Sequence, residues 1–211
     1  MVEVKLGQQS VDLPFTLRVP GVTEELFEEL VDPDTRAELI DGVMIVHSPA
    51  AMDHDDVGGF LRGLLGFFGD AKGLGKALGP DSVVHLATCR KFAPDIYFLL
   101  QEHVPMPLPK EFEGAPDFVI EILSPSNRDD DLEDKRPAYR EAGVGEIWFV
   151  DPENRQILID RKRKRRYVEE VVASGRAASE MVAGFWVDAS WLWAEPLPNR
   201  MASLQEILAG K

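Results

Sequence analysis

The chain has 211 residues, of which 45% are hydrophobic and 28% are charged, and its formal net charge is -14. These proportions are typical of a globular protein and exclude a mainly disordered chain, and the length suits one α/β domain with a sizeable core. The single cysteine excludes an internal disulfide, and the acidic balance argues against tight, non-specific binding to DNA.

The sequence shows no sign of a membrane segment. No apolar run approaches the roughly 20 residues that a spanning helix needs. The N-terminus Met-Val-Glu-Val-Lys has neither the basic region nor the apolar region of a signal peptide. We therefore expect a cytoplasmic protein without membrane contact.

The first part of the chain predicts a helix, a hairpin and a second helix. Apolar residues recur at helical spacing over 23–31, behind Thr23 as a cap. The stretch 37–46 reads as two short strands around an Asp-Gly turn, which is the strongest short hairpin signal. A longer amphipathic pattern over 53–72 predicts a core helix with Asp53 as its cap.

Three strand-like segments follow, at 82–87, 95–100 and 118–123. The last two are almost continuously apolar, which predicts strands buried on both faces. An acidic stretch at 129–134 leads into a helix that ends near Gly143, and 146–151 predicts another strand. The expected order is therefore helix, three strands, helix and strand.

The C-terminal part predicts an added hairpin and an aromatic tail. Strands at 156–160 and 167–172 flank the basic run 161–166, which either contacts phosphate groups or, as we favour, forms a solvated turn. The tail 185–193 is rich in aromatic residues, and 204–208 predicts a last short helix. Tryptophans in such a tail either stack on bases or, more commonly, pack in a core or a subunit interface.

Several phrases of the sequence resemble one family. These are Ala-Glu-Leu-Ile-Asp-Gly at 37–42, Ser-Pro-Ala at 48–50 followed by His54, Ala-Pro-Asp-Ile at 93–96, and Pro-Asp-Phe-Val-Ile-Glu-Ile-Leu-Ser-Pro-Ser at 116–126. The pattern continues with Lys135, Tyr139, Gly143-Val144 and Glu-Ile-Trp-Phe-Val-Asp-Pro at 146–152. Together they resemble the Uma2 (DUF820) family of the PD-(D/E)XK nuclease superfamily. The resemblance implies a restriction-endonuclease-like α/β core, in which helices flank a mixed sheet. We expect one domain over 1–211, with an N-terminal extension (1–36), a family core (37–152) and a C-terminal hairpin and tail (153–211).

The resemblance also implies a site for Mg²⁺ or Mn²⁺ that hydrolyses DNA, with Asp95 and Glu121 as the metal ligands. The usual superfamily lysine lies two residues after the strand acid, but Leu123 stands there. Lys135 matches the helix lysine that serves instead in Uma2-like chains. A proline is tolerated only in the first turn of a helix, so the position of Lys135 depends on whether the helix begins close to Pro137.

Three further residues are candidates for a supporting role. Glu38 and His54 belong to the family phrases, and each is either a group around the metal or an ordinary structural residue. Asp117 shares a strand face with Glu121 because residues four apart point the same way, but it also suits the start of the strand. We take His47 as ordinary structure and the acids 129–131 as groups that favour the helix N-terminus.

Each metal ligand has a structural alternative. Asp95 could be a turn residue after Pro94. Glu121 lies inside an apolar strand, where a charge is costly to bury unless it is paired or coordinated, and Arg128 is the alternative partner. The whole chain could likewise be a catalytically inactive binding or regulatory scaffold with a nuclease fold.

The aromatic tail leads to one prediction of assembly. Four aromatic residues lie close together in sequence, at Phe185, Trp186, Trp191 and Trp193. They carry more apolar surface than a short extension is expected to bury alone, which predicts a homodimer. The alternative is that the tail folds back on its own sheet.

Overall fold

The computed structural model describes residues 16–31, 35–47, 51–125 and 127–210, together with two short paired strands, β1 (Lys5–Leu6) and β2 (Gln9–Ser10). The first part of the predicted N-terminal extension therefore lies outside the described residues. Within the described residues, no helix combines the length and the apolar composition needed to cross a membrane.

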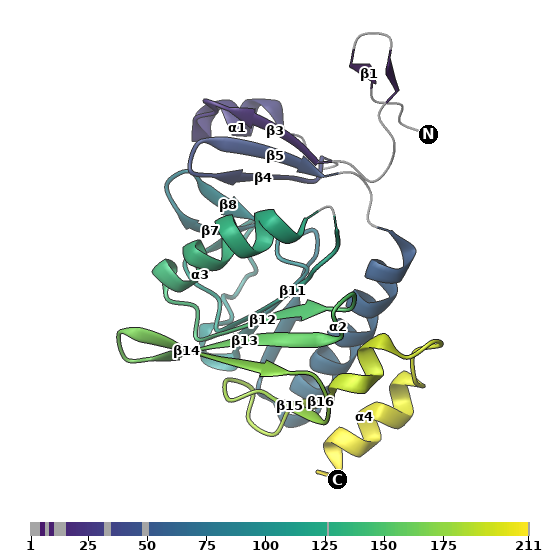
Figure 1. The fold of residues 1–211 in the computed structure, drawn as a ribbon. Coiled ribbons are helices and arrows are strands. Elements are labelled where there is room, and N and C mark those ends of the chain that lie inside the picture. The colour runs from purple at the N-terminus through teal and green to yellow at the C-terminus, as the bar shows by residue number, and fades with distance from the viewer. Residues whose placement is uncertain are drawn as a thin grey trace.

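Two six-stranded sheets form the frame of the fold (Figure 1). The first sheet has the order β10-β7-β8-β4-β5-β3, with bounds Phe112–Glu113, Val84–Ala87, Arg90–Phe92, Ala37–Ile40, Val43–His47 and Thr16–Pro20. The second has the order β14-β13-β12-β11-β9-β6, with bounds Arg166–Val172, Gln156–Arg163, Glu146–Asp151, Phe118–Ile122, Ile96–Leu100 and Gly75–Leu78. Its β11 and β12 run parallel, whereas its other neighbouring strands run antiparallel, so it is mixed.

Helices cover both faces of the second sheet (Figure 1). The long α2 (Met52–Lys72) lies against one face, α4 (Arg200–Leu208) packs against α2, and α3 (Arg136–Ala142) lies between the two sheets. The remaining elements are α1 (Glu24–Leu30), η1 (Gln101–His103), η2 (Asp130–Lys135), η3 (Ala189–Trp193), and a small sheet of β15 (Arg176–Ala178) and β16 (Trp186–Asp188).

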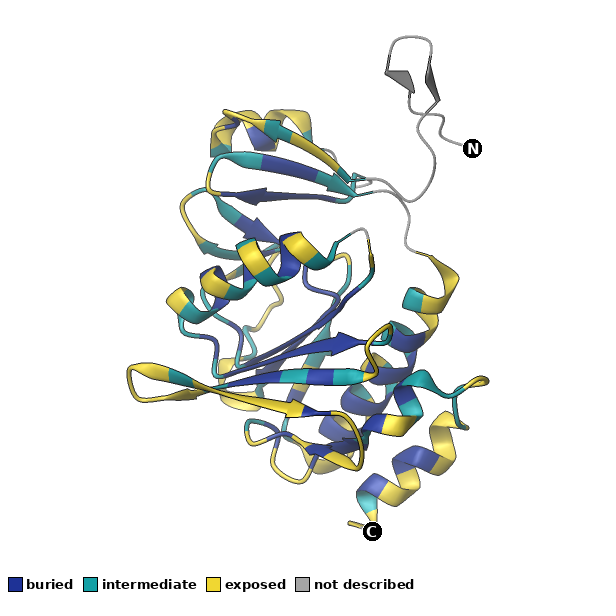
Figure 2. Ribbon diagram, viewed as in Figure 1, coloured by how far each residue is buried: buried dark blue, intermediate teal, exposed yellow. Residues whose placement is uncertain are grey.

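The central strands are the most deeply buried part of the molecule (Figure 2). All residues of β11 and β12 are buried, and in β9 only the last residue is partly exposed. This confirms the continuous apolar pattern as the signature of strands covered on both faces. One core cluster lies between the sheet and α2, and another between the two sheets around Tyr139 and Phe149.

The predicted order of helix, three strands, helix and strand is correct, but the first core strand was misplaced. Segment 82–87 contributes β7, which belongs to the other sheet, and the strand that precedes β9 and β11 in the core sheet is β6. Gly75 opens β6 at φ 147°, and a Cβ there would lie 2.0 Å from the carbonyl oxygen of Leu99. Glycine permits this close approach, and it also weakens the strand signal in the sequence.

Two other predictions need correction. The N-cap of α2 is Ala51, which makes no side-chain capping bond, and Asp53 lies in the first turn instead. The aromatic tail folds back on its own domain: Phe185 is fully buried, Trp186 is 7% exposed, and both belong to the core cluster under α2. The premise of a large exposed aromatic surface is therefore wrong, while the homodimer itself stays a prediction.

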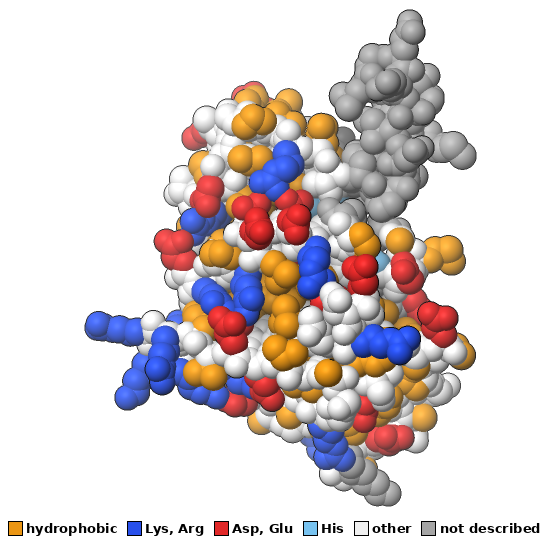
Figure 3. All heavy atoms as spheres, viewed as in Figure 1, with side chains coloured by type: hydrophobic (Ala, Val, Ile, Leu, Met, Phe, Trp, Pro, Cys, Tyr) orange, Lys and Arg blue, Asp and Glu red, His pale blue; other side chains and the backbone are white. Residues whose placement is uncertain are grey.

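The basic run forms the protruding end of the β13–β14 hairpin, where Lys and Arg side chains gather (Figure 3). Arg163 pairs with Glu180 at 2.6 Å, and Arg161 pairs with Glu170. The hairpin tip does not line the cavity that holds the candidate site. This arrangement favours the reading of a solvated turn.

Candidate active site

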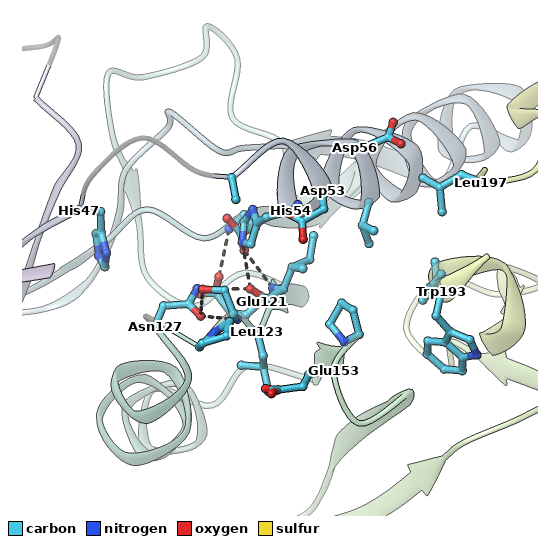
Figure 4. A pocket seen from close by; sticks show the side chains of 18 of the residues that line it. His47, Asp53, His54, Asp56, Glu121, Leu123, Asn127, Glu153, Trp193 and Leu197 are labelled. Atoms are coloured by element: carbon cyan, nitrogen blue, oxygen red, sulfur yellow. Dashed lines mark hydrogen bonds and ion pairs between the residues drawn. The ribbon is translucent and has the colours of Figure 1, made fainter. Parts of the chain in front are cut away.

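A cavity of about 680 Å³ lies beside the N-terminal part of α2 and the carboxyl end of β11 (Figure 4). Its lining includes five of the six residues that the sequence singled out: Glu38, His54, Asp95, Glu121 and Lys135. They come from β4, α2, the residue before β9, β11 and the helical turn before α3. Residues far apart in sequence therefore meet in one place.

Asp95 and Glu121 form the floor of this site. The antiparallel pairing of β9 with β11 places Ile96 opposite Ile120, so the two acids lie side by side. Glu121 Oε2 accepts a hydrogen bond from the Asp95 N–H at 3.1 Å, and Asp95 Oδ2 accepts one from the Ile122 N–H at 2.9 Å. Each carboxylate is thereby held by the backbone of the neighbouring strand, which fixes its orientation without a flexible partner.

Two basic side chains face Asp95. Arg36 Nη2 lies 3.0 Å from Asp95 Oδ1, and His54 Nε2 lies 3.3 Å from Oδ2 and 2.9 Å from the carbonyl oxygen of Ile122. Burial alone would raise the pKa of Asp95, but His54, the Ile122 N–H and Arg36 together hold that pKa below its usual value. Asp95 therefore stays ionised at neutral pH.

Lys135 projects into the same cluster from a π-helical turn, η2 (Asp130–Lys135). Its ammonium group lies 2.9 Å from Glu38 Oε2, 3.0 Å from Asp131 Oδ1 and 3.4 Å from Glu121 Oε1. Burial would lower the pKa of Lys135, but these carboxylates raise it well above the usual value. Pro137 falls in the first turn of α3, as a proline requires, so it does not displace this lysine.

Three further contacts extend the hydrogen bonding of the site. The hydroxyl of Tyr139 donates to Glu121 Oε1 at 2.6 Å. Glu38 accepts from the Ala93 N–H at 2.8 Å and lies 2.8 Å from His47 Nε2. Burial opposes ionisation of Glu38, but Lys135, His47 and the Ala93 N–H lower its pKa to about 2.

The cluster carries an excess of negative charge. Four buried carboxylates, those of Glu38, Asp95, Glu121 and Asp131, face two permanently charged side chains, Arg36 and Lys135. Burial and the neighbouring carboxylates raise the pKa of Glu121, and raise that of Asp131 well above its usual value. Carboxylate oxygens of this kind are the ligands that a hard divalent cation prefers.

A second group of potential ligands lies on the first sheet. One ligand atom each from His85, Glu111 and Glu113 lies within 4.8 Å of the others. These groups already have partners, because Lys91 Nζ lies 3.0 Å from Glu111 and His85 Nδ1 lies 3.0 Å from Glu113. The side chain of Glu113 is 73% exposed, whereas Asp95 and Glu121 are both buried at one cavity, so we take the site around Asp95 as the better candidate.

Two of the sequence-based assignments do not fit the cavity. Asp117 accepts from the Leu100 N–H at 2.8 Å and from His103 at the opposite end of β11, so it does not support the site. Arg128, the alternative partner of Glu121, pairs instead with Asp151 at 2.8 Å.

The sequence reasoning overlooked four residues around the site: Arg36, His47, Asp131 and Tyr139. Asp131 lies in the first turn of η2, as expected for an acid at a helix N-terminus, but its side chain is also fully buried beside Lys135. One signal was available, because residues 131, 135 and 139 recur at intervals of four and so lie along one helical face. Nothing in the local sequence marks Arg36 or His47.

Comparisons with known proteins agree with this architecture. The model of the Uma2 family, which is described as "Putative restriction endonuclease", matches residues 24–190. A solved protein from Anabaena variabilis ATCC 29413, described as a "putative nuclease belonging to DUF820", superposes with a TM-score of 0.71 and 18% sequence identity. The match covers 82% of this chain and 97% of that protein, whereas no curated protein matches. Because the family match extends over well more than half of the sequence, the chain belongs to the Uma2 family.

Proposed function

We propose that this chain is an endonuclease that depends on Mg²⁺ or Mn²⁺ and hydrolyses phosphodiester bonds in DNA. The observation that carries the proposal is the pair Asp95 and Glu121, which is buried with Lys135 at one cavity. The printed descriptions of the family and of the Anabaena protein support a nuclease-like function.

Asp95 and Glu121 would hold the metal ion. When bound, the ion supplies a Lewis acid that polarises a phosphate and lowers the pKa of a water molecule. Within the chain, the hydrogen bonds between the two strands hold both carboxylates in place. This preorganisation avoids the cost of ordering the ligands when the ion binds.

The cations of the site would act on the phosphate group. Lys135 stays protonated because three carboxylates raise its pKa, so it offsets negative charge on the phosphoryl oxygens rather than accepting a proton. Arg36 lies on the other side of Asp95 and is 31% exposed, which leaves part of its guanidinium accessible to a second oxyanion.

Metal binding can be tested directly by calorimetric titration with Mn²⁺. Asp95→Asn and Glu121→Gln preserve the shape of each side chain but remove its charge, and we expect both to abolish high-affinity binding. His85→Ala is the matched control, because it removes the other group of potential ligands. Full binding in the Asp95 and Glu121 variants, with loss in the His85 variant, would move the metal to the first sheet and contradict the proposed site.

Hydrolysis is tested separately, with supercoiled, linear duplex and single-stranded DNA in Mg²⁺ or Mn²⁺. Asp95→Asn purified in parallel is the control, because any cleavage that survives in it comes from a contaminant. Metal binding without cleavage of any of these substrates would favour the rival function of an inactive scaffold with a nuclease fold. The proposal also includes DNA as the partner, a homodimeric assembly and a cytoplasmic location.

A further inference from the structure

The cavity has a second, apolar part that the metal site does not use. Val57 of α2 and residues of the 192–197 segment line it, among them Leu192, Trp193, Pro196 and Leu197. Figure 4 shows Trp193 and Leu197 on the side of the pocket away from Glu121 and Asn127. One cavity therefore joins a charged floor to an apolar wall.

We infer that this cavity admits an unpaired nucleotide, and that the ring of Trp193 is the platform on which its base stacks. The inference rests on the proposed function and specifies its substrate as single-stranded or locally unpaired DNA.

Trp193 differs from the nearby Trp191 in its contacts with other aromatic rings. Trp191 packs against Trp186, with ring centroids 5.4 Å apart, and against Phe60 at 6.5 Å. In the part of the chain that the structure describes, Trp193 makes no aromatic contact of this kind, although it packs partly against the core. Its remaining surface lines the cavity. A partly buried indole at the wall of a cavity is a residue on which a nucleobase can stack.

The charges around the cavity disfavour a duplex. Four exposed acids line it, namely Asp53, Asp56, Glu153 and Glu195, against one exposed base, Arg155. Double-stranded DNA carries one negative charge for about every 1.7 Å of its axis, so a duplex across this opening would bring many phosphates close to carboxylates. A single inserted nucleotide brings far fewer.

The two parts of the cavity match the two ends of a nucleotide. Arg36 and Lys135 lie at the charged floor, where a phosphate would be placed beside the Asp95 and Glu121 pair. The apolar wall with Trp193 would receive the base. An apolar ligand alone would leave the charged floor unmatched, and a metal ion alone would leave the apolar wall unused. A nucleotide satisfies both.

Binding can be measured apart from cleavage. A fluorescein-labelled single strand of about 16 nucleotides and the duplex of the same sequence are titrated in Ca²⁺, with fluorescence anisotropy as the readout. We expect the single strand to bind more tightly than the duplex. Trp193→Ala should weaken single-strand binding about 5- to 150-fold, because base stacking on an aromatic ring contributes a free energy of that size.

Three further variants separate stacking from packing. Trp193→Phe should restore most of the affinity, whereas Trp193→Leu, which keeps apolar volume but loses the aromatic face, should not. Phe67→Ala is the control, because Phe67 is an exposed aromatic residue on α2 that does not line the cavity. This variant should bind the single strand like the wild type. Melting temperatures show whether each variant is folded.

Equal affinity for the duplex and the single strand, no binding of either, or equal binding by the Trp193→Leu and Trp193→Phe variants would overturn the inference. A different result would contradict the proposed nuclease function alone: the wild type would bind the single strand through Trp193 but cleave no DNA in Mg²⁺ or Mn²⁺. Cleavage of duplex DNA that is indifferent to Trp193 would retain the nuclease and exclude the unpaired substrate.

Discussion

Replacing Lys135 with methionine should destabilise the protein strongly. The Lys135 side chain is 5% exposed, and its ammonium group is within 3.4 Å of the carboxylates of Glu38, Asp131 and Glu121. Methionine keeps the length and apolar volume of the side chain but removes the charge. Three buried carboxylates would then lose a cation that they share.

The magnitude follows from the cost of an uncompensated buried charge. Removing one partner of a buried ion pair typically costs about 3–5 kcal/mol, which is a large part of a stability of about 5–15 kcal/mol. For a chain of this size we expect the melting temperature to fall by about 6–20 °C. Lys76→Met is the control, because Lys76 is exposed on β6 and surface changes usually stay within about 0.5 kcal/mol.

The stability that the Lys135→Met variant loses should be smaller at pH 5 than at pH 7. In the wild type, Lys135 helps to lower the pKa of Glu38 to about 2, so Glu38 stabilises the fold above its unfolded pKa of about 4.5. Without Lys135 this contribution falls, and the raised pKa values of Glu121 and Asp131 rise further. Protonation then relieves the repulsion, so the deficit should shrink between pH 7 and pH 5.

Urea unfolding followed by circular dichroism at both pH values measures these free energies. A Lys135→Met variant as stable as the wild type at pH 7 would refute the role of the lysine as a shared counter-charge. A deficit that grows toward pH 5 would refute the account of the pH dependence.

Two other outcomes are expected. Glu121→Gln should stabilise the metal-free protein in urea at pH 7, because a folded pKa raised above the unfolded value makes the charged carboxylate unfavourable there; a less stable variant would contradict the direction of that shift. Light scattering at micromolar concentration should show a mass twice the 23.5 kDa of one chain if the predicted homodimer forms, and a mass near 23.5 kDa would exclude it.

Much of the fold could be read from local patterns. The Asp-Gly hairpin places Asp41 and Gly42 at positive φ between β4 and β5, which is the backbone conformation that this turn chemistry selects. Gly143 ends α3 at φ 92°, again as its position in the sequence predicts. These signals are local, so they survive in any tertiary context.

The sheet assignment of β7 and the overlooked site residues depend on contacts between distant parts of the chain, which no local sequence pattern predicts. The assignment of β7 to the first sheet depends on which neighbours its edges find, since β7 pairs with β8 and β10. Likewise, Arg36 and His47 join the site through partners elsewhere in the chain, since Arg36 contacts Asp95 and His47 contacts Glu38. A charged residue becomes part of a site through its partners, and those partners are distant in sequence.

A further test asks whether a lysine at position 123, on the strand side of the site, can replace Lys135. Residues 121 and 123 share one face of a strand, and Leu123 lines the same cavity as Glu121 and Lys135 (Figure 4). A lysine at 123 should therefore reach the carboxylates that Lys135 serves. We expect Leu123→Lys to restore part of the stability and part of any cleavage activity when it is added to Lys135→Met.

Leu123→Lys alone is the matched control. It adds a second cation to a site that already has one and removes a leucine that is only 4% exposed, so by itself it should destabilise the protein. The rescue would then be a coupling between the two positions, measured as a double-mutant cycle in urea. A double variant whose loss of stability equals the sum of the two single losses would show that the site cannot accept its cation from the strand. Lys135 would then be required because of its position and not only because of its charge.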